Sequence, residues 1–268
     1  MLSAEQRAEF NELGVVKLRV FSPAEAGRMR DAVWGELACV HGIRRDEPAS
    51  WRAGNVHGLE RIRELPTFVP IMGCRAAIDD LLGPESWDVP KRWGAFLVTF
   101  PTAGEWDVPS AVWHVDFSYA LPPEPLSGVK VFTFLSDVPA RGGGTLVVTG
   151  SHRVIQRFIK GRSLEKLRNT RRTRFELCGS HQWLRNLTSW SSARDRVRRF
   201  IDHGSTIVGI AVRVVELTGE AGEVVLTHPW VMHCRAPNCG QTPRFMRTVD
   251  IYRREVHPTV FPLRRATP

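Results

Sequence analysis

The chain has 268 residues, of which 43% are hydrophobic and 24% charged, a composition that excludes a disordered or fibrous protein and allows a sizeable buried core. No apolar stretch of the sequence is long enough to span a bilayer. The formal net charge is +9, and 32 of the 37 basic residues are arginine. This charge is typical either of a protein with an anionic partner or of an arginine-rich surface exposed to solvent.

The cysteines indicate the redox compartment. They form no C-x-x-C pair, and their odd number fits no complete disulfide framework. The first 14 residues also lack the basic and apolar regions of a secretory signal. We therefore expect reduced thiols and a cytoplasmic location. The five cysteines are Cys39, Cys74, Cys178, Cys234 and Cys239.

Capping signals predict two helices near the N-terminus. Ser3 begins SAEQ and Ser22 begins SPAE, and each serine is followed three residues later by Gln or Glu. The first helix is expected to end at Gly14 and the second to cover about residues 23–40. Between them, VVKLRVF alternates like a short strand. A third helix is expected over about residues 68–82.

From Arg92 onward the sequence changes to a period of two, which predicts an antiparallel sandwich or barrel. A basic insert of about residues 155–205 divides the strands, and we expect two helices in it, the second capped by SARD (192–195). We expect a single domain over residues 1–268, with an N-terminal helical region of about residues 1–90. The predicted strands are RWGAFLVTF, AVWHVDFSYA, GVKVFTFLSDV, TLVVTG, AVRVVEL, GEVVLTH, WVMHC and FMRTVDIY.

The stretch WHVDF places a histidine and an aspartate two residues apart. On a strand, residues i and i+2 point to the same face, so His114 and Asp116 would share a side, opposite three apolar residues. Such a pair is either a buried hydrogen-bonded pair or two ligands of a metal ion. The His-x-Asp pattern alone is a weak signal, because the chain has nine histidines.

The segment THPWVMHCRAPNCGQTPRFMR contains the remaining candidates. His228 and His233 are five residues apart, so on a regular strand they point to opposite faces. Two histidines and one carboxylate suit a non-haem Fe(II) that must also bind a co-substrate and dioxygen. Arg244, farther along, could hold the far carboxylate of a 2-oxo acid through paired, charge-assisted hydrogen bonds.

In this order, WHVDF, GGGTLVVTGSHR, HPWVMHCRAPN and PRF resemble the phytanoyl-CoA dioxygenase family of Fe(II)- and 2-oxoglutarate-dependent oxygenases. The segment LSAEQRAEFNELGVVKLRVFSPAEA resembles that family's entry into its fold. The resemblance leaves residues 42–90 and 155–205 unmatched. It implies a mainly β fold with flanking helices, built on a double-stranded β-helix (a jelly-roll, cupin-like core).

The resemblance also implies roles for individual residues. It favours His233 over His228, because only His233 is followed by the x-x-x-Pro-Asn that the family places after its ligand. Val115 stands where the family often has glutamine, which removes a polar contact near the co-substrate. The implied iron ligands and catalytic residues are His114, Asp116 and His233, and the implied 2-oxoglutarate-binding residues are Arg244, Thr145 and Asn238.

The implied activity is that of a dioxygenase that uses Fe(II), 2-oxoglutarate and O2. Because Asp116 is present, we expect hydroxylation, desaturation or cyclisation rather than the halogenation performed by relatives with Ala or Gly at this position. The expected substrate is a small molecule, in a tailoring step of antibiotic or other secondary-metabolite biosynthesis. Two alternatives stay open: modification of nucleic acid, suggested by the basic insert, and a cupin-like module that binds metal without turnover. The sequence indicates neither the substrate's identity nor the oligomeric state.

Overall fold

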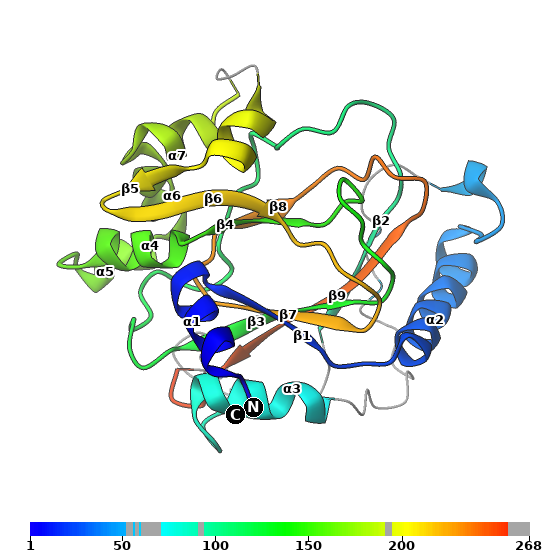
Figure 1. Ribbon diagram of the computed structural model, residues 1–268, viewed down its shortest axis with the longest axis horizontal. Coiled ribbons are helices and arrows are strands. Elements are labelled where there is room, and N and C mark those ends of the chain that lie inside the picture. The colour runs from blue at the N-terminus through cyan, green and yellow to red at the C-terminus, as the bar shows by residue number, and fades with distance from the viewer. Residues whose placement is uncertain (52–55, 57–58, 60–70, 91–93, 191–194, 257–268) are drawn as a thin grey trace, which may run out of the picture.

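The computed structural model describes residues 1–51, 56, 59, 71–90, 94–190 and 195–256. Two antiparallel sheets form its centre, one of five strands in the order β1-β7-β3-β9-β2 and one of four in the order β5-β6-β4-β8 (Figure 1). The chain passes between the sheets, as in a jelly roll. The strands are β1 (Val15–Arg19), β2 (Ala95–Thr99), β3 (Gly128–Phe134), β4 (Thr145–Thr149), β5 (Ser205–Ile207), β6 (Ile210–Glu216), β7 (Glu223–Thr227), β8 (His233–Arg235) and β9 (Arg244–Tyr252).

The N-terminal helices begin where the capping signals predicted. Helix α1 (Ala4–Leu13) and helix α2 (Pro23–His41) each have a complete capping box, formed by Ser3 and Ser22. Gly14 ends α1 with a φ of 81°, a left-handed conformation that glycine adopts without steric cost. These two predictions are confirmed.

Helices α2 and α3 (Ile71–Leu82) cover the outer face of the five-stranded sheet. Apolar side chains of α2, including Val33 and Leu37, join one buried cluster with the outward side chains of the strands. Ile78 of α3 belongs to the same cluster. The predicted third helix is confirmed over its described part, and its expected start at residues 68–70 lies outside the described residues.

The insert covers the other side of the molecule. It contains four short helices, α4 (Ser151–Ile159), α5 (Leu164–Arg168), α6 (Thr170–Gly179) and α7 (Gln182–Leu187), followed by a π-helical segment, Arg198–His203. The prediction of two helices is therefore wrong in number, and the expected cap at 192–194 lies outside the described residues. These helices lie beside the four-stranded sheet (Figure 1). They pack through one apolar cluster against the outward side chains of β4 and β6.

The space between the sheets holds a third, smaller apolar cluster, which includes Phe132, Phe134, Val147 and Met246. Polar groups share this interior, among them the buried side chains of Arg244 and others on the inward faces of the strands. A polar group inside a sheet sandwich needs a partner or a ligand. The interior is therefore where a functional site is to be sought.

The predicted strand over AVWHVDFSYA is wrong as regular structure. Within this segment His114 forms a single antiparallel bridge, with His233. The alternation nevertheless persists: Trp113, Val115 and Phe117 are buried in the cluster beneath the insert, and the residues between them are partly exposed. Buried and more exposed side chains thus alternate as on a strand, although the segment forms only one bridge and no continuous ladder of hydrogen bonds.

The described helices include none that is both long and apolar enough to cross a membrane. All five cysteines are unpaired.

Candidate metal centre

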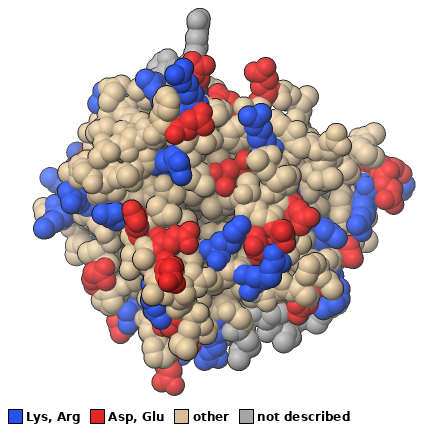
Figure 2. Space-filling view, in the orientation of Figure 1, with Lys and Arg blue, Asp and Glu red and all other residues tan. Residues whose placement is uncertain are grey.

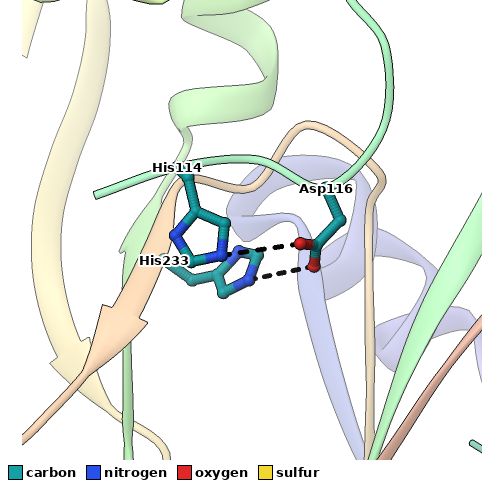
Figure 3. Close-up of side chains that lie close together, drawn as sticks. All are labelled: His114, Asp116 and His233. Atoms are coloured by element: carbon teal, nitrogen blue, oxygen red, sulfur yellow. Dashed lines mark ion pairs between the residues drawn. The ribbon is translucent and has the colours of Figure 1, made fainter. Parts of the chain in front are cut away.

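Three predicted ligands meet in space. One ligand atom from each of His114, Asp116 and His233 lies within 4.8 Å of the others. Nε2 of His114 is 3.5 Å from Oδ1 of Asp116, and Nε2 of His233 is 3.2 Å from Oδ2 of the same carboxylate (Figure 3). The two imidazole rings have centroids 4.4 Å apart. His114 and Asp116, from an irregular segment, and His233, from β8, thus direct their ligand atoms to the same place.

The second nitrogen of each imidazole fixes its orientation. Nδ1 of His114 is 2.7 Å from the carbonyl oxygen of Val112, and Nδ1 of His233 is 3.0 Å from that of Val231. Because a carbonyl oxygen only accepts, each Nδ1 carries the hydrogen. In a neutral ring Nε2 is then a free acceptor, and it faces the carboxylate of Asp116, which also only accepts. A cation between these three acceptors satisfies all of them, so the residues fit a metal ion.

Val112 adopts a strained conformation to place its carbonyl group. Its φ is 60°, in the left-handed region that β-branched residues rarely occupy. The side chain is 67% exposed, so packing does not impose this conformation. Strain of this kind persists where the surrounding structure requires it, and here it orients the ring of His114.

The charge of Asp116 is strongly stabilised. Burial raises the pKa of this carboxyl group, but His114, His233 and Lys130 together outweigh burial and hold the pKa well below its usual range. The same carboxylate raises the pKa of His114, against the effect of burial. Asp116 is therefore ionised and available to a metal at any working pH.

Arg244, at the start of β9, is 2% exposed and lies in the interior. Its guanidinium donates to the hydroxyl of Thr99 and, at 3.3 Å, to the sulfur of Met246, while its Nε has no partner among the described residues. Burial and the nearby Arg235 lower the pKa of Arg244 to about 10, and Glu216 opposes this shift. A buried guanidinium with only neutral acceptors at hydrogen-bond distance is a site for an anion.

Thr145 lies close to this arginine, and Asn238 has a structural role. The hydroxyl of Thr145 is 3.7 Å from the sulfur of Met246, the atom that Arg244 also contacts. The amide of Asn238 donates to the carbonyl oxygens of Thr99 and Thr242, at 3.0 and 2.9 Å, and accepts from the main chain of the following loop. Asn238 thus holds the loop that leads into β9.

His228 lies apart from the triad. Its ring packs against that of His152, with centroids 4.7 Å apart, and both side chains are buried. His228 is therefore a buried residue that packs on His152. His233 is the histidine that faces Asp116.

Comparison with known proteins decides the family. The model of the phytanoyl-CoA dioxygenase (PhyH) family matches residues 72–246, well over half of the chain. The chain belongs to this family. As a member of it, the protein is an Fe(II)- and 2-oxoglutarate-dependent dioxygenase, with Fe(II) as its metal and 2-oxoglutarate and O2 as co-substrates. No curated protein matches the sequence.

Solved structures agree with the PhyH fold. The non-heme alpha ketoglutarate dependent carbocyclase SnoK from nogalamycin biosynthesis has 21% identity and a TM-score of 0.52, over 100% of this chain and 92% of SnoK. The epimerase SnoN, in complex with Fe3+, alpha ketoglutarate and nogalamycin RO, has 15% identity and a TM-score of 0.51, over 93% and 82%. EvdO2 from Micromonospora carbonacea var. aurantiaca has 15% identity and a TM-score of 0.50, over 94% and 92%. At these identities the likeness establishes the jelly-roll fold.

Sequence reasoning missed two residues of the PhyH site, Lys130 on β3 and Asp250 on β9. Nζ of Lys130 lies 2.5 Å from Oδ2 of Asp116 and 3.0 Å from Oδ1 of Asp250. The available signal was a charged residue at an inward position of the apolar strand GVKVFTF. Its partner could not be found from sequence, because the pairing depends on the register of β3 with β9.

A third missed residue, Arg196, joins the insert to the segment before His114. Its buried guanidinium donates to the carbonyl oxygens of Val108 and Pro109, at 2.6 and 3.0 Å. It also donates to those of Asn186 and Leu187, at 3.2 and 2.6 Å. This one side chain thus connects α7 to the loop that leads to the metal ligands.

Proposed function

We propose that the protein oxidises a small molecule in a biosynthetic tailoring step. In this proposal His114, Asp116 and His233 hold Fe(II), and Arg244 holds the distal carboxylate of 2-oxoglutarate with Thr145 beside it. The observation that carries the proposal is the convergence of three metal-ligating atoms, together with a buried guanidinium whose hydrogen-bond acceptors among the described residues are uncharged. Asn238 supports the co-substrate site indirectly, through the loop that it holds.

Each residue has a defined task. The two histidines present Nε2 because their Nδ1 atoms are held by carbonyl oxygens, and Asp116 offsets part of the metal's charge. When bound, the iron would activate O2, which is the oxidant: 2-oxoglutarate would supply two electrons and leave as succinate and CO2, and the substrate would supply the other two by losing hydrogen. Phe132, whose ring centroid is 5.8 Å from that of His233, contributes an apolar wall that limits access of water.

Two observations bear on the type of reaction. SnoK is a carbocyclase and SnoN an epimerase, and both belong to nogalamycin biosynthesis, which supports a tailoring reaction on a biosynthetic small molecule. The chain keeps the carboxylate of Asp116, so no ligand position is opened for a halide. We therefore propose hydroxylation, desaturation or cyclisation rather than halogenation.

Anaerobic binding tests the proposal directly. Addition of Fe(II) and then 2-oxoglutarate is expected to produce a weak visible charge-transfer band, and admission of O2 is expected to release succinate. Asp116→Ala is expected to lose both signals, and Asp46→Ala, an exposed aspartate, to keep them. A wild-type protein that neither develops the band nor releases succinate would contradict the proposal and favour a module that binds metal without turnover.

Nucleic acid is the second candidate substrate, suggested by the charge of +9 and the basic insert. Part of the insert's charge is compensated, since Arg162 and Arg172 both pair with Glu176, at 2.6 and 2.9 Å. On the face shown in Figure 2, basic and acidic side chains are interspersed. Salt-dependent retention on DNA or RNA would favour this candidate, and no retention at low salt would remove it.

We also propose that residues 1–268 form one oxygenase domain, with the N-terminal helices and the insert packed on it. The shared apolar clusters on the outer faces of both sheets support this. The cytoplasmic location stays a prediction from cysteine usage.

A further inference from the structure

Lys130 is a buried lysine between two carboxylates. It is 8% exposed, and its Nζ contacts Asp116 at 2.5 Å and Asp250 at 3.0 Å. Asp250 stands directly opposite Lys130 in the register of β3 and β9, so the main chain fixes the pair. Both contacts are ion pairs between an ammonium group and a carboxylate. A cation therefore lies at the edge of the metal site.

The choice of lysine is unusual for this chain. Arginine outnumbers lysine by 32 to 5 in the sequence, and the other lysines that the structure describes, Lys17, Lys160 and Lys166, are exposed. An ammonium group is compact and has three N–H donors, whereas a guanidinium is a larger planar fork. Two N–H donors reach Asp116 and Asp250, which leaves the third N–H for another acceptor.

The charges change when a divalent metal binds. Without metal, one ammonium serves two carboxylates, Asp116 and Asp250. A dication attracts the carboxylate of Asp116 more strongly than a monocation does at similar distance, so the contact of Asp116 with Lys130 weakens. The ammonium group, which contacts an oxygen of the proposed ligand Asp116 in the metal-free protein, would then be available to the carboxylate of a 2-oxo acid bound at the metal.

We propose that Lys130 binds the metal-side carboxylate of the 2-oxo acid, after bridging Asp116 and Asp250 in the metal-free protein. This inference rests on the proposed function and adds a residue to it. Arg244 and Lys130 then hold opposite ends of the co-substrate, so two buried cations meet its two negative charges. In the metal-free protein Lys130 competes with the metal for Asp116.

The experiment measures metal and acid binding separately. Co(II) is titrated into wild type, Lys130→Met, Lys130→Arg and Lys17→Met by calorimetry. The metal-loaded proteins are then titrated with 2-oxoglutarate and with pyruvate, which has the chelating half of the co-substrate but no distal carboxylate. Lys17→Met is the matched control, because this exposed lysine lies at the surface on β1.

Lys130→Met is expected to bind Co(II) alone several-fold more tightly and to bind both acids about tenfold more weakly. Lys130→Arg is expected to recover most of the acid affinity, and Lys17→Met to match wild type. Arg244→Met is expected to weaken 2-oxoglutarate but not pyruvate. If Lys130→Met binds both acids as tightly as wild type does, this inference is overturned but the proposed function stands. The same holds if the variant loses metal binding and acid binding in parallel. A wild type that shows no metal-dependent binding of 2-oxoglutarate would overturn the proposed function as well.

Discussion

The main chains of His114 and His233 hydrogen-bond to each other in both directions. The N–H of His114 donates to the carbonyl oxygen of His233 at 3.0 Å, and the N–H of His233 donates to that of His114 at 2.9 Å. This reciprocal pair sets the register of the two ligands before any metal arrives. The metal centre is therefore largely preformed, and substitutions around it should affect binding more than folding.

Asp116→Ala is expected to lower substrate oxidation by more than about a hundredfold. Substitution of residues that only support metal ligands already lowers metal affinity or activity by about ten- to a hundredfold. Asp116 is proposed to bind the metal directly, so its loss should cost more. Succinate release with a candidate substrate measures the effect, and circular dichroism confirms the fold. Full turnover in this variant would show that Asp116 is not a ligand.

Arg244→Met is expected to abolish the stabilisation of the protein by 2-oxoglutarate. A ligand at a hundred times its Kd raises the free energy of unfolding by about 2.7 kcal/mol. In the variant this gain should disappear while the stabilisation by Co(II) alone persists. Thermal unfolding with each ligand separates the two effects. Arg244→Lys should rescue poorly, because an ammonium cannot make the paired contact of a guanidinium.

Stability should fall between about pH 6.5 and 4 because of His152. Burial lowers the pKa of His152 to about 4, from 6.5 in an unfolded chain. In this window the unfolded chain binds a proton that the folded chain does not, so the free energy of unfolding decreases as the pH falls, by about 3 kcal/mol at most. Urea unfolding from pH 4 to 7 measures the slope. His152→Gln should reduce the slope but not remove it, because burial also lowers the pKa of His228. An identical slope in the variant would show that His152 does not contribute.

Arg196→Lys is expected to destabilise the fold by about 2–4 kcal/mol. A lysine cannot serve four carbonyl groups at once, and buried acceptors that lose a charged donor are costly. Because two of those carbonyl groups belong to the segment before His114, metal affinity should fall too. Arg199→Lys, an exposed neighbour, is expected to change stability by less than about 0.5 kcal/mol. Equal effects of the two variants would remove any special role of Arg196.

Val112→Asn is expected to stabilise the protein by about 1 kcal/mol. Asparagine tolerates the left-handed conformation that strains valine, and the exposed side chain loses little packing. Metal affinity should stay unchanged, because the carbonyl group that holds His114 is part of the main chain. Val40→Asn, at an exposed position of helix α2, should give no such gain. Chemical unfolding of both variants distinguishes relief of strain from a general effect of polarity.

Local chemistry explains which parts of the fold could be predicted from sequence. The capping boxes of Ser3 and Ser22 involve residues only three apart, so both helix starts can be predicted from the sequence alone. The β-rich core follows from period-two alternation. All the described strands after Arg92 except the short β5 overlap the predicted runs, although β6, β8 and β9 each extend one residue beyond them. The three proposed metal ligands could be predicted from their spacing and from the family resemblance. The structure brings one ligand atom from each within 4.8 Å of the others.

Tertiary structure explains what the sequence could not show. The segment around His114 alternates like a strand, but a partner main chain reaches it only at His233. The insert forms more and shorter helices than expected, because short helices depend on packing rather than on their own propensity. The contact of Lys130 with Asp250 exists only through the register of two strands far apart in the chain.

The four hydrogen bonds of Arg196 limit how the helical insert can be exchanged in an engineered protein. Exchange of the helical insert with that of a relative is an obvious route to altered selectivity, since loops carry much of an enzyme's variation. Here a graft that omits Arg196, or that alters Val108 and Pro109 opposite it, would remove the hydrogen bonds that hold the segment with the proposed iron ligand His114. The transplantable unit is therefore the insert together with the stretch just upstream of His114.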